Sequence, residues 1–117
     1  MIALHGDLRI LIATQPIDFR KGVNGLVLMI EETLKSNPYD GTIFLFRSKR
    51  NDRLKMLTYD GSGVILATKW LEAGRFTWPP IQEGMMRLPA AKVALLVAGL
   101  DWSRVAQPTV KRPTKAA

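Results

Sequence analysis

The sequence predicts a single α+β domain in which an antiparallel β-meander is packed by one long helix and a C-terminal helix. Three short runs rich in aromatic and aliphatic residues, 42–47, 53–59 and 64–71, are joined by turn residues that include Gly, Asn and Asp. This punctuation is typical of a meander. A separate stretch, residues 20–36, carries apolar residues at helical spacing. With 117 residues the chain is long enough to bury one core without a metal or disulfide.

The elements before the meander follow from local patterns. Residues 9–14 form a continuous apolar run, which predicts a buried strand. Asp18 stands where a helix N-cap is expected, because its carboxylate accepts hydrogen bonds from free backbone N–H groups and suits the positive end of a helix. The predicted helix is marked by one apolar stripe: Val23, Leu26, Val27, Ile30 and Leu34. Asn37-Pro38 ends it.

Alternation along residues 53–59 sorts the side chains of the central run onto two faces. One face receives Arg53, Lys55, Leu57 and Tyr59, and we expect it to be basic, aromatic and open to water. The other face receives Leu54, Met56 and Thr58. It is the face that suits a core.

After the meander, residues 76–78 predict a short strand that Pro79-Pro80 breaks, and residues 81–87 give no regular pattern. A second helix is expected from Pro89, because proline is well placed in a first helical turn. Gly99 predicts its end, with Trp102 folded back onto the body. Residues 1–102 are therefore expected to form the domain. Residues 103–117, rich in Pro, Lys, Thr and Ala, are expected to be a disordered basic tail.

The net charge of +7 favours a polyanionic partner. Residues 47–75 carry seven basic and three acidic side chains, and residues 103–117 carry four basic side chains and no acidic one. The absence of cysteine excludes disulfides and thiolate chemistry. No run has the length of a membrane span or the layout of a signal peptide, so we expect a cytoplasmic chain that does not bind membranes.

Candidate catalytic residues are few. His5 is the single histidine and is expected to be a solvated surface residue. Asp52, Asp60 and Glu72 are the candidates for a divalent-metal cluster beside the basic face, as phosphodiester chemistry would require. The simpler interpretation, which we favour, is that Asp52 and Asp60 hydrogen-bond their own turns. We expect no enzyme activity, no cofactor and no metal.

The basic residues of the central stretch are the candidate nucleic-acid contacts. Cations that meet phosphates, interleaved with aromatic rings that stack on bases, are what such a surface needs. The alternative is an ordinary solvated sheet face, on which lysine and arginine also discourage aggregation. The candidates are Arg47, Lys49, Arg50, Arg53, Lys55, Lys69 and Arg75.

Several motifs in a fixed order resemble one known family. They are Pro16-x-Asp18-x-Arg20-Lys21-Gly22, Phe44-x-Phe46-Arg47, Arg53-x-Lys55-x-Leu57, Tyr59-Asp60-Gly61-x-Gly63, Lys69-x-Leu71-Glu72-x-Gly74-Arg75-Phe76-x-Trp78-Pro79 and Gly99-x-Asp101-Trp102. Over about residues 8–102 the chain resembles the small TnpB accessory protein of insertion sequences of type sixty-six. In this chain Tyr59 and Trp70 stand where the family commonly has Trp and Arg.

The resemblance implies a non-catalytic accessory role in transposition, beside a separate transposase that carries out strand transfer. Two hypotheses follow. In the preferred one the protein binds DNA at the element's ends, or a transposition intermediate, through a basic antiparallel hairpin. In the alternative it is a protein-interaction module that docks the transposase, with the basic face against an acidic partner.

Overall fold

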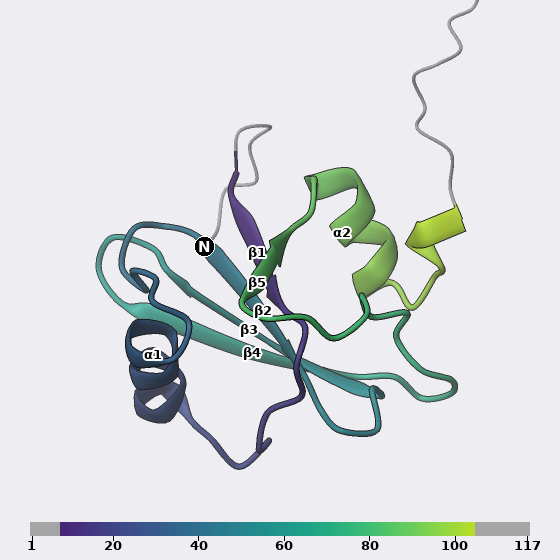
Figure 1. Cartoon of the computed structure of the whole chain (residues 1–117), viewed down its shortest axis with the longest axis horizontal. Coiled ribbons are helices and arrows are strands. Elements are labelled where there is room, and N and C mark those ends of the chain that lie inside the picture. Colours follow the sequence, from purple (N-terminus) through teal and green to yellow (C-terminus); the bar gives the residue numbers. More distant parts are fainter. Residues whose placement is uncertain (1–7, 105–117) are drawn as a thin grey trace, which may run out of the picture.

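The computed structural model describes residues 8–104 and contains one five-stranded mixed sheet with two helices (Figure 1). The strands lie in the order β4-β3-β2-β1-β5. Their bounds are β1 Ile10–Ala13, β2 Ile43–Arg47, β3 Arg53–Tyr59, β4 Val64–Trp70 and β5 Met85–Arg87. The helices are α1 Val23–Glu32 and α2 Ala90–Val97, followed by a short 3-10 helix, η1 Trp102–Arg104. The α+β class is as predicted.

The expectation of a purely antiparallel sheet is wrong, because β1 pairs with β2 in parallel. Parallel neighbours need a long crossover connection, and α1 lies in that connection. The pairs β2–β3, β3–β4 and β1–β5 are antiparallel. The three runs of the central stretch therefore do fold as consecutive neighbours, inside a larger sheet.

Helices cover both faces of the sheet, so the expectation of one water-facing side is also wrong. On one face α1 packs Leu26 and Ile30, both completely buried, against residues that include Phe44, Phe46 and Leu57. On the other face α2 packs against a second core, built on residues of β1, β2 and β3. Figure 1 shows the two helices on opposite sides of the strands. The layers are helix, sheet and helix.

Helix α1 is shorter than the predicted residues 20–36, and Asp18 does not cap it. The N-cap is Gly22, which makes no side-chain cap. The Asp18 carboxylate instead accepts from the backbone N–H of Arg20, two residues on. An Asp that hydrogen-bonds its own turn competes with helix formation. The chain from Pro16 to Gly22 is consequently a loop.

The C-terminal third differs from expectation in two places. Residues 76–78 are not a strand, and three residues that showed no pattern, Met85–Arg87, form β5 at the sheet edge. Helix α2 begins after Pro89, as predicted. Gly99 ends it with φ +81°, its N–H donating to Leu96 O while Leu100 N–H donates to Leu95 O. This is a Schellman termination, which favours glycine.

Trp102 folds back onto the α2 side of the sheet, as predicted, and is buried there. Its indole N–H donates to Thr77 O over 2.5 Å. Beyond it, Ser103 and Arg104 belong to η1. The rest of the predicted tail, and His5, lie outside the described residues.

An apolar groove of about 450 Å³ remains between α2 and the β3–β4 part of the sheet. Its lining is almost entirely aliphatic, with Met56, Val93 and Val97 among the residues that form it. Helix α2 is only eight residues long and does not cover the whole of this face. No helix of residues 8–104 is long and apolar enough to cross a bilayer.

Candidate nucleic-acid interface

The loop before α1 is fastened to the end of β2 by two hydrogen bonds. The Ile17 N–H donates to the Arg47 carbonyl over 3.1 Å, and Arg47 Nε donates to the Thr14 carbonyl over 3.2 Å. Partial burial lowers the pKa of the Arg47 guanidinium below its ordinary value. The first basic residue predicted to meet nucleic acid is thus held against the protein's own backbone.

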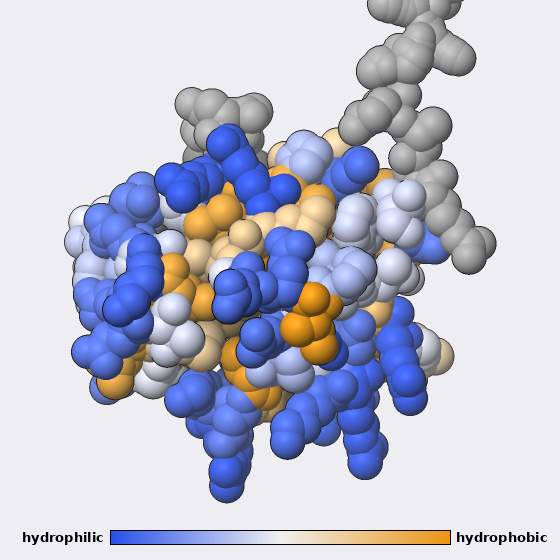
Figure 2. Space-filling model, in the orientation of Figure 1, coloured by the Kyte–Doolittle hydropathy of each residue, from blue (hydrophilic) through white to orange (hydrophobic). Residues whose placement is uncertain are grey.

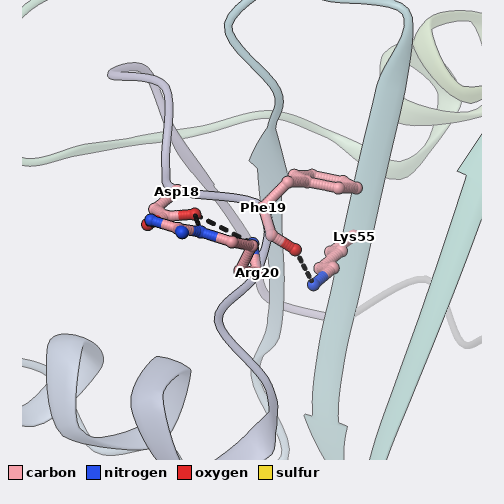
Figure 3. A network of polar contacts seen from close by, with 4 residues as sticks. All are labelled: Asp18, Phe19, Arg20 and Lys55. Atoms are coloured by element: carbon pink, nitrogen blue, oxygen red, sulfur yellow. Dashed lines mark hydrogen bonds and ion pairs between the residues drawn. The ribbon is translucent and has the colours of Figure 1, made fainter.

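Lys55 holds the same loop to strand β3 (Figure 3). Its ammonium donates to the carbonyls of Phe19 and Lys21, each over 2.7 Å, and lies 4.6 Å from the centre of the Phe19 ring. The residue is only 8% exposed. The alternation of side chains was predicted correctly, but the face that carries Lys55 is covered by α1 and by this loop. Lysine tolerates such a site because its stem is apolar and its head finds acceptors.

Asp18 and Arg20 form an ion pair at the tip of the loop. Arg20 Nη2 lies 2.7 Å from Asp18 Oδ2, and Nε lies 3.0 Å from Oδ1 (Figure 3). These bonds from Arg20 hold the pKa of the Asp18 carboxyl well below its usual range. Both side chains are solvent-exposed, so the pair orders the loop tip rather than the core.

The turn between β2 and β3 is built from its own polar side chains. Ser48 Oγ accepts from the Arg53 N–H and donates to Asp52 Oδ1. Asn51 adopts φ +64°, a left-handed conformation that Asn tolerates better than most residues. This geometry leaves Lys49 and Arg50 exposed at the tip of the turn. In the described residues neither has an ion-pair partner.

The loop before α1 and the β2–β3 turn together form a cleft of about 420 Å³, which we call the basic cleft. It is lined by Pro16, Ile17, Asp18, Phe19, Arg20, Ser48, Lys49, Arg50, Asp52 and Arg53. Four of these side chains are cationic and two are carboxylates, one of which is already paired with Arg20. Figure 2 shows long hydrophilic side chains projecting along the lower edge of the molecule, where Figure 1 places this loop and this turn.

Arg53 forms part of the wall of the basic cleft. Its Nε atom is buried and has no hydrogen-bond partner within residues 8–104. Its guanidinium carbon lies 4.3 Å from the centre of the Trp70 ring on the neighbouring strand β4. A buried guanidinium N–H without an acceptor is unusual in a folded protein. Within residues 8–104 no carboxylate pairs with the Arg53 guanidinium, so its charge is not neutralised by an ion pair there.

The remaining predicted contacts divide between the two faces. Arg75 is exposed in the loop after β4, and this loop is tied to the turn because the Phe76 N–H donates to the Asn51 carbonyl over 2.7 Å. Lys69 lies on the α2 face, where its ammonium donates to the Val97 carbonyl over 2.6 Å. Arg75 is therefore carried by a loop tied to the β2–β3 turn, whereas Lys69 lies on the other face of the sheet.

Arg20 and its loop are the part of the cleft that the search for basic residues missed. The sequence predicts a helix start over the stretch from Pro16 to Gly22, and a helix start gives no reason to place its side chains beside the hairpin. The available signal was the motif itself, since Pro16, Asp18 and Arg20 are among the residues that carry the family resemblance. That motif lies in space beside the β2–β3 turn.

Two of the three carboxylates considered as a metal cluster, Asp52 and Asp60, lie at opposite ends of β3. Asp52 precedes β3 and Asp60 follows it, so seven strand residues separate them, a span of roughly 25 Å at about 3.3 Å per residue. Asp60 accepts from the N–H groups of Ser62 and Gly63, which lowers its pKa. The turn interpretation of Asp60 is confirmed. Across the described part of the chain no group of three His, Cys, Asp or Glu residues is placed to hold a metal ion.

Comparison with known proteins gives the family. Residues 8–107 match the family model described as IS66 Orf2 like protein. The chain belongs to the IS66 Orf2-like family. It is an accessory protein of an insertion sequence, and an accessory role is consistent with the expectation of a non-enzyme. Two of the motifs that carry the resemblance, Pro16-x-Asp18-x-Arg20-Lys21-Gly22 and Arg53-x-Lys55-x-Leu57, supply residues of the basic cleft and of the contacts that hold its loop.

Two relatives of this IS66 Orf2-like protein come from Sinorhizobium fredii (strain NBRC 101917 / NGR234). The uncharacterized protein y4jC is 54% identical over 117 residues, which is 100% of both chains. The uncharacterized protein y4hO is 42% identical over 115 residues, or 98% of each chain. No solved structure matches the chain.

Proposed function

We propose that this IS66 Orf2-like protein binds DNA of its insertion sequence by taking backbone phosphates into the basic cleft. One observation carries the proposal: of the four cations that line the cleft, only Arg20 is paired with a carboxylate within residues 8–104. Lys49 and Arg50 are exposed at the rim and lack an ion-pair partner within residues 8–104, and Arg53, which also lacks one there, forms part of the wall. Placing cations beside phosphates releases counterions and favours binding.

The phosphate contacts assigned to the cleft come from Lys49, Arg50 and Arg53, and the exposed Arg75 joins them from the loop that is tied to the turn. Lys55 and Arg47 are given a supporting role, since their polar groups already bind the carbonyls of the loop. Lys69 is left out because it lies on the other face. Arg20 joins the set through its place in the lining.

Contacts to phosphates rather than to base edges fit the rest of the fold. A recognition helix presents base-reading side chains to the major groove. Helix α1 contains no lysine or arginine, ends in Glu31-Glu32 and buries its apolar face on the sheet. Helix α2 likewise packs on the sheet and carries one lysine. Apart from Arg53, which begins β3, the cations of the cleft come from loops and none comes from a helix, which favours affinity with little sequence discrimination.

The test compares wild type with the double variant Lys49→Ala/Arg50→Ala. Both side chains are exposed at a turn tip, so their removal should leave the melting temperature unchanged. The affinity for an end fragment of the element, and for an unrelated fragment, is measured from roughly 50 to 200 mM salt. The logarithmic salt slope should fall by about 1.8 on duplex DNA, or about 1.4 on single strands, for two phosphate contacts removed.

A charge-matched control is Arg9→Ala/Arg87→Ala. Both residues are exposed, and both lie toward the end of the sheet opposite the β2–β3 turn. This control should change the slope by much less than the cleft variant. If wild type binds no DNA at low salt, while the cleft variant loses association with the element's transposase, the docking hypothesis replaces this one.

A further inference from the structure

Trp70 is exposed where a tryptophan is not needed for packing. It is 62% exposed, more than any other large hydrophobic side chain of residues 8–104. The other two tryptophans serve the fold: Trp78 Nε1 donates to the Ala13 carbonyl and Trp102 Nε1 to the Thr77 carbonyl. An exposed ring of this size at a sheet edge suggests a use in binding.

The ring is held in a defined position by Arg53. The two residues are directly opposite each other in the β3–β4 register and therefore share one face of the sheet. The guanidinium carbon lies 4.3 Å from the ring centre, which is the geometry of a cation–π contact. Trp70 ends β4, the edge strand, so no further strand lies beyond it. One side of the ring faces Arg53, and much of the rest meets solvent.

Arg53 also joins this ring to the basic cleft. It belongs to the cleft lining and follows directly on the turn that carries Lys49 and Arg50. A strand of nucleic acid whose phosphates meet these cations would bring its bases within reach of the Trp70 ring. Any unpaired base can stack on an exposed aromatic face, whatever its sequence. Bases inside a duplex are already stacked on each other and present only their edges in the grooves.

We propose that Arg53 and Trp70 form a stacking platform for an unpaired base, and that the basic cleft therefore prefers single-stranded DNA to duplex DNA. This inference rests on the proposed function and specifies the form of DNA. Arg53 belongs to both parts, because its guanidinium lies over the ring and the residue also lines the cleft. Single strands are exposed when the ends of an element are opened or cut with a stagger, which gives such a preference a place in transposition.

The experiment measures the affinity of the full chain for a labelled single strand and for the duplex of the same length and sequence, at one salt concentration. Wild type should bind the single strand more tightly. Trp70→Ala should weaken single-strand binding by roughly 5- to 150-fold, the range expected for one base stacked on an aromatic ring. Its duplex affinity should remain close to that of wild type. Trp70→Phe should recover most of the single-strand affinity, because it restores an aromatic face.

Two controls separate stacking from a general effect. Tyr39→Ala removes another exposed aromatic ring, one in edge contact with Tyr59 at the far end of β3, and should leave both affinities unchanged. Acrylamide quenching of tryptophan fluorescence should decrease when the single strand is added to wild type, because the exposed ring becomes covered. If Trp70→Ala fails to fold, Trp70→Leu takes its place. The leucine variant should then bind the single strand more weakly than Trp70→Phe does.

The outcomes distinguish this inference from the proposed function. Equal affinity for both forms of DNA, or an equal loss for both in Trp70→Ala, overturns the stacking platform and leaves phosphate binding in place. Absence of binding to either form by wild type at low salt overturns both. A leucine variant that binds the single strand as well as the phenylalanine variant also contradicts stacking, since leucine has no aromatic face.

Discussion

Replacing Lys55 by methionine tests whether this side chain belongs to the fold or to the DNA surface. Methionine keeps an apolar, unbranched side chain but offers no donor to the carbonyls of Phe19 and Lys21. If the side chain fastens the loop, as its burial indicates, the variant loses stability. If it met phosphates instead, the variant would keep its stability and lose only DNA affinity.

The expected size of the effect follows from the interactions that methionine cannot make. A hydrogen bond to a charged group contributes about 1.5–3 kcal/mol, and two such bonds disappear. The cation–π interaction with the Phe19 ring adds about 0.5–1 kcal/mol. Two effects offset part of this loss of stability. Water can hydrogen-bond to the loop carbonyls once the ammonium is gone, and the variant no longer has to bury a charge. We expect a net decrease of about 2–4 kcal/mol in the free energy of unfolding.

For a domain of this size that decrease corresponds to a melting temperature lower by roughly 10–25 °C. Circular dichroism melts and urea titrations measure it. The matched control is Lys69→Met, which removes one exposed bond to the Val97 carbonyl and should cost less than about 1 kcal/mol. A Lys55→Met variant that melts within about 2 °C of wild type would refute the assignment of Lys55 to the fold.

Three further predictions concern the core, the loop tip and the chain beyond residue 104. Ile30→Asp puts an unpaired charge at a completely buried position and should abolish cooperative folding, whereas an unchanged thermal melt would remove Ile30 from the core. The pKa of Asp18 is lowered in the folded protein, so its contribution should be complete above pH of about 5 and should fade as pH falls through the folded pKa. The difference in urea midpoint between wild type and Asp18→Asn should follow that course, and a difference independent of pH would contradict it. Removing residues 105–117 takes away three cations and should weaken DNA binding at low salt with an unchanged melting temperature, while a lower melting temperature would show that the segment supports the fold.

The strands of the central stretch could be predicted almost residue by residue. The expected runs 42–47, 53–59 and 64–71 became β2, β3 and β4 with shifts of one residue at two ends. Period-two alternation and turn residues such as Asp60-Gly61 depend only on residues that are close in the sequence, so they can be recognised without knowing the rest of the fold. The same is true of the end of α2, where Gly99 takes the left-handed conformation that its position predicted.

The pairing of β1 and the existence of β5 were not predictable in this way. Both depend on partners far along the chain: Leu11 pairs with Phe44 on one side and with Arg87 on the other. A three-residue edge strand such as β5 has too few residues for a period to be recognised. It forms because β1 has backbone hydrogen-bonding groups on the side away from β2, and β5 pairs with them.

The candidate site was predicted in part. Lys49, Arg50 and Arg53 lie at the basic cleft, as their place in and after a polar turn indicated. Lys55 was assigned to open water because alternation tells which residues share a face and not whether a helix covers it. The place of Arg20 in the cleft was not predicted, because the sequence predicts a helix start at Asp18. In the structure the Asp18 carboxylate accepts from the Arg20 N–H, and residues 16–20 form a loop that lines one wall of the cleft.

The most direct test of the central claim is a titration of the labelled protein with a short oligonucleotide, followed by the shifts of its backbone amide resonances. Binding in the basic cleft predicts that the amides of residues 17–20 and 48–53 shift most, together with the indole N–H of Trp70. The amides around the Asp60 turn, at the other end of β3, should not move. Shifts concentrated instead in the apolar groove, at Met56, Val93 and Val97, would place the partner on the α2 face and contradict the account.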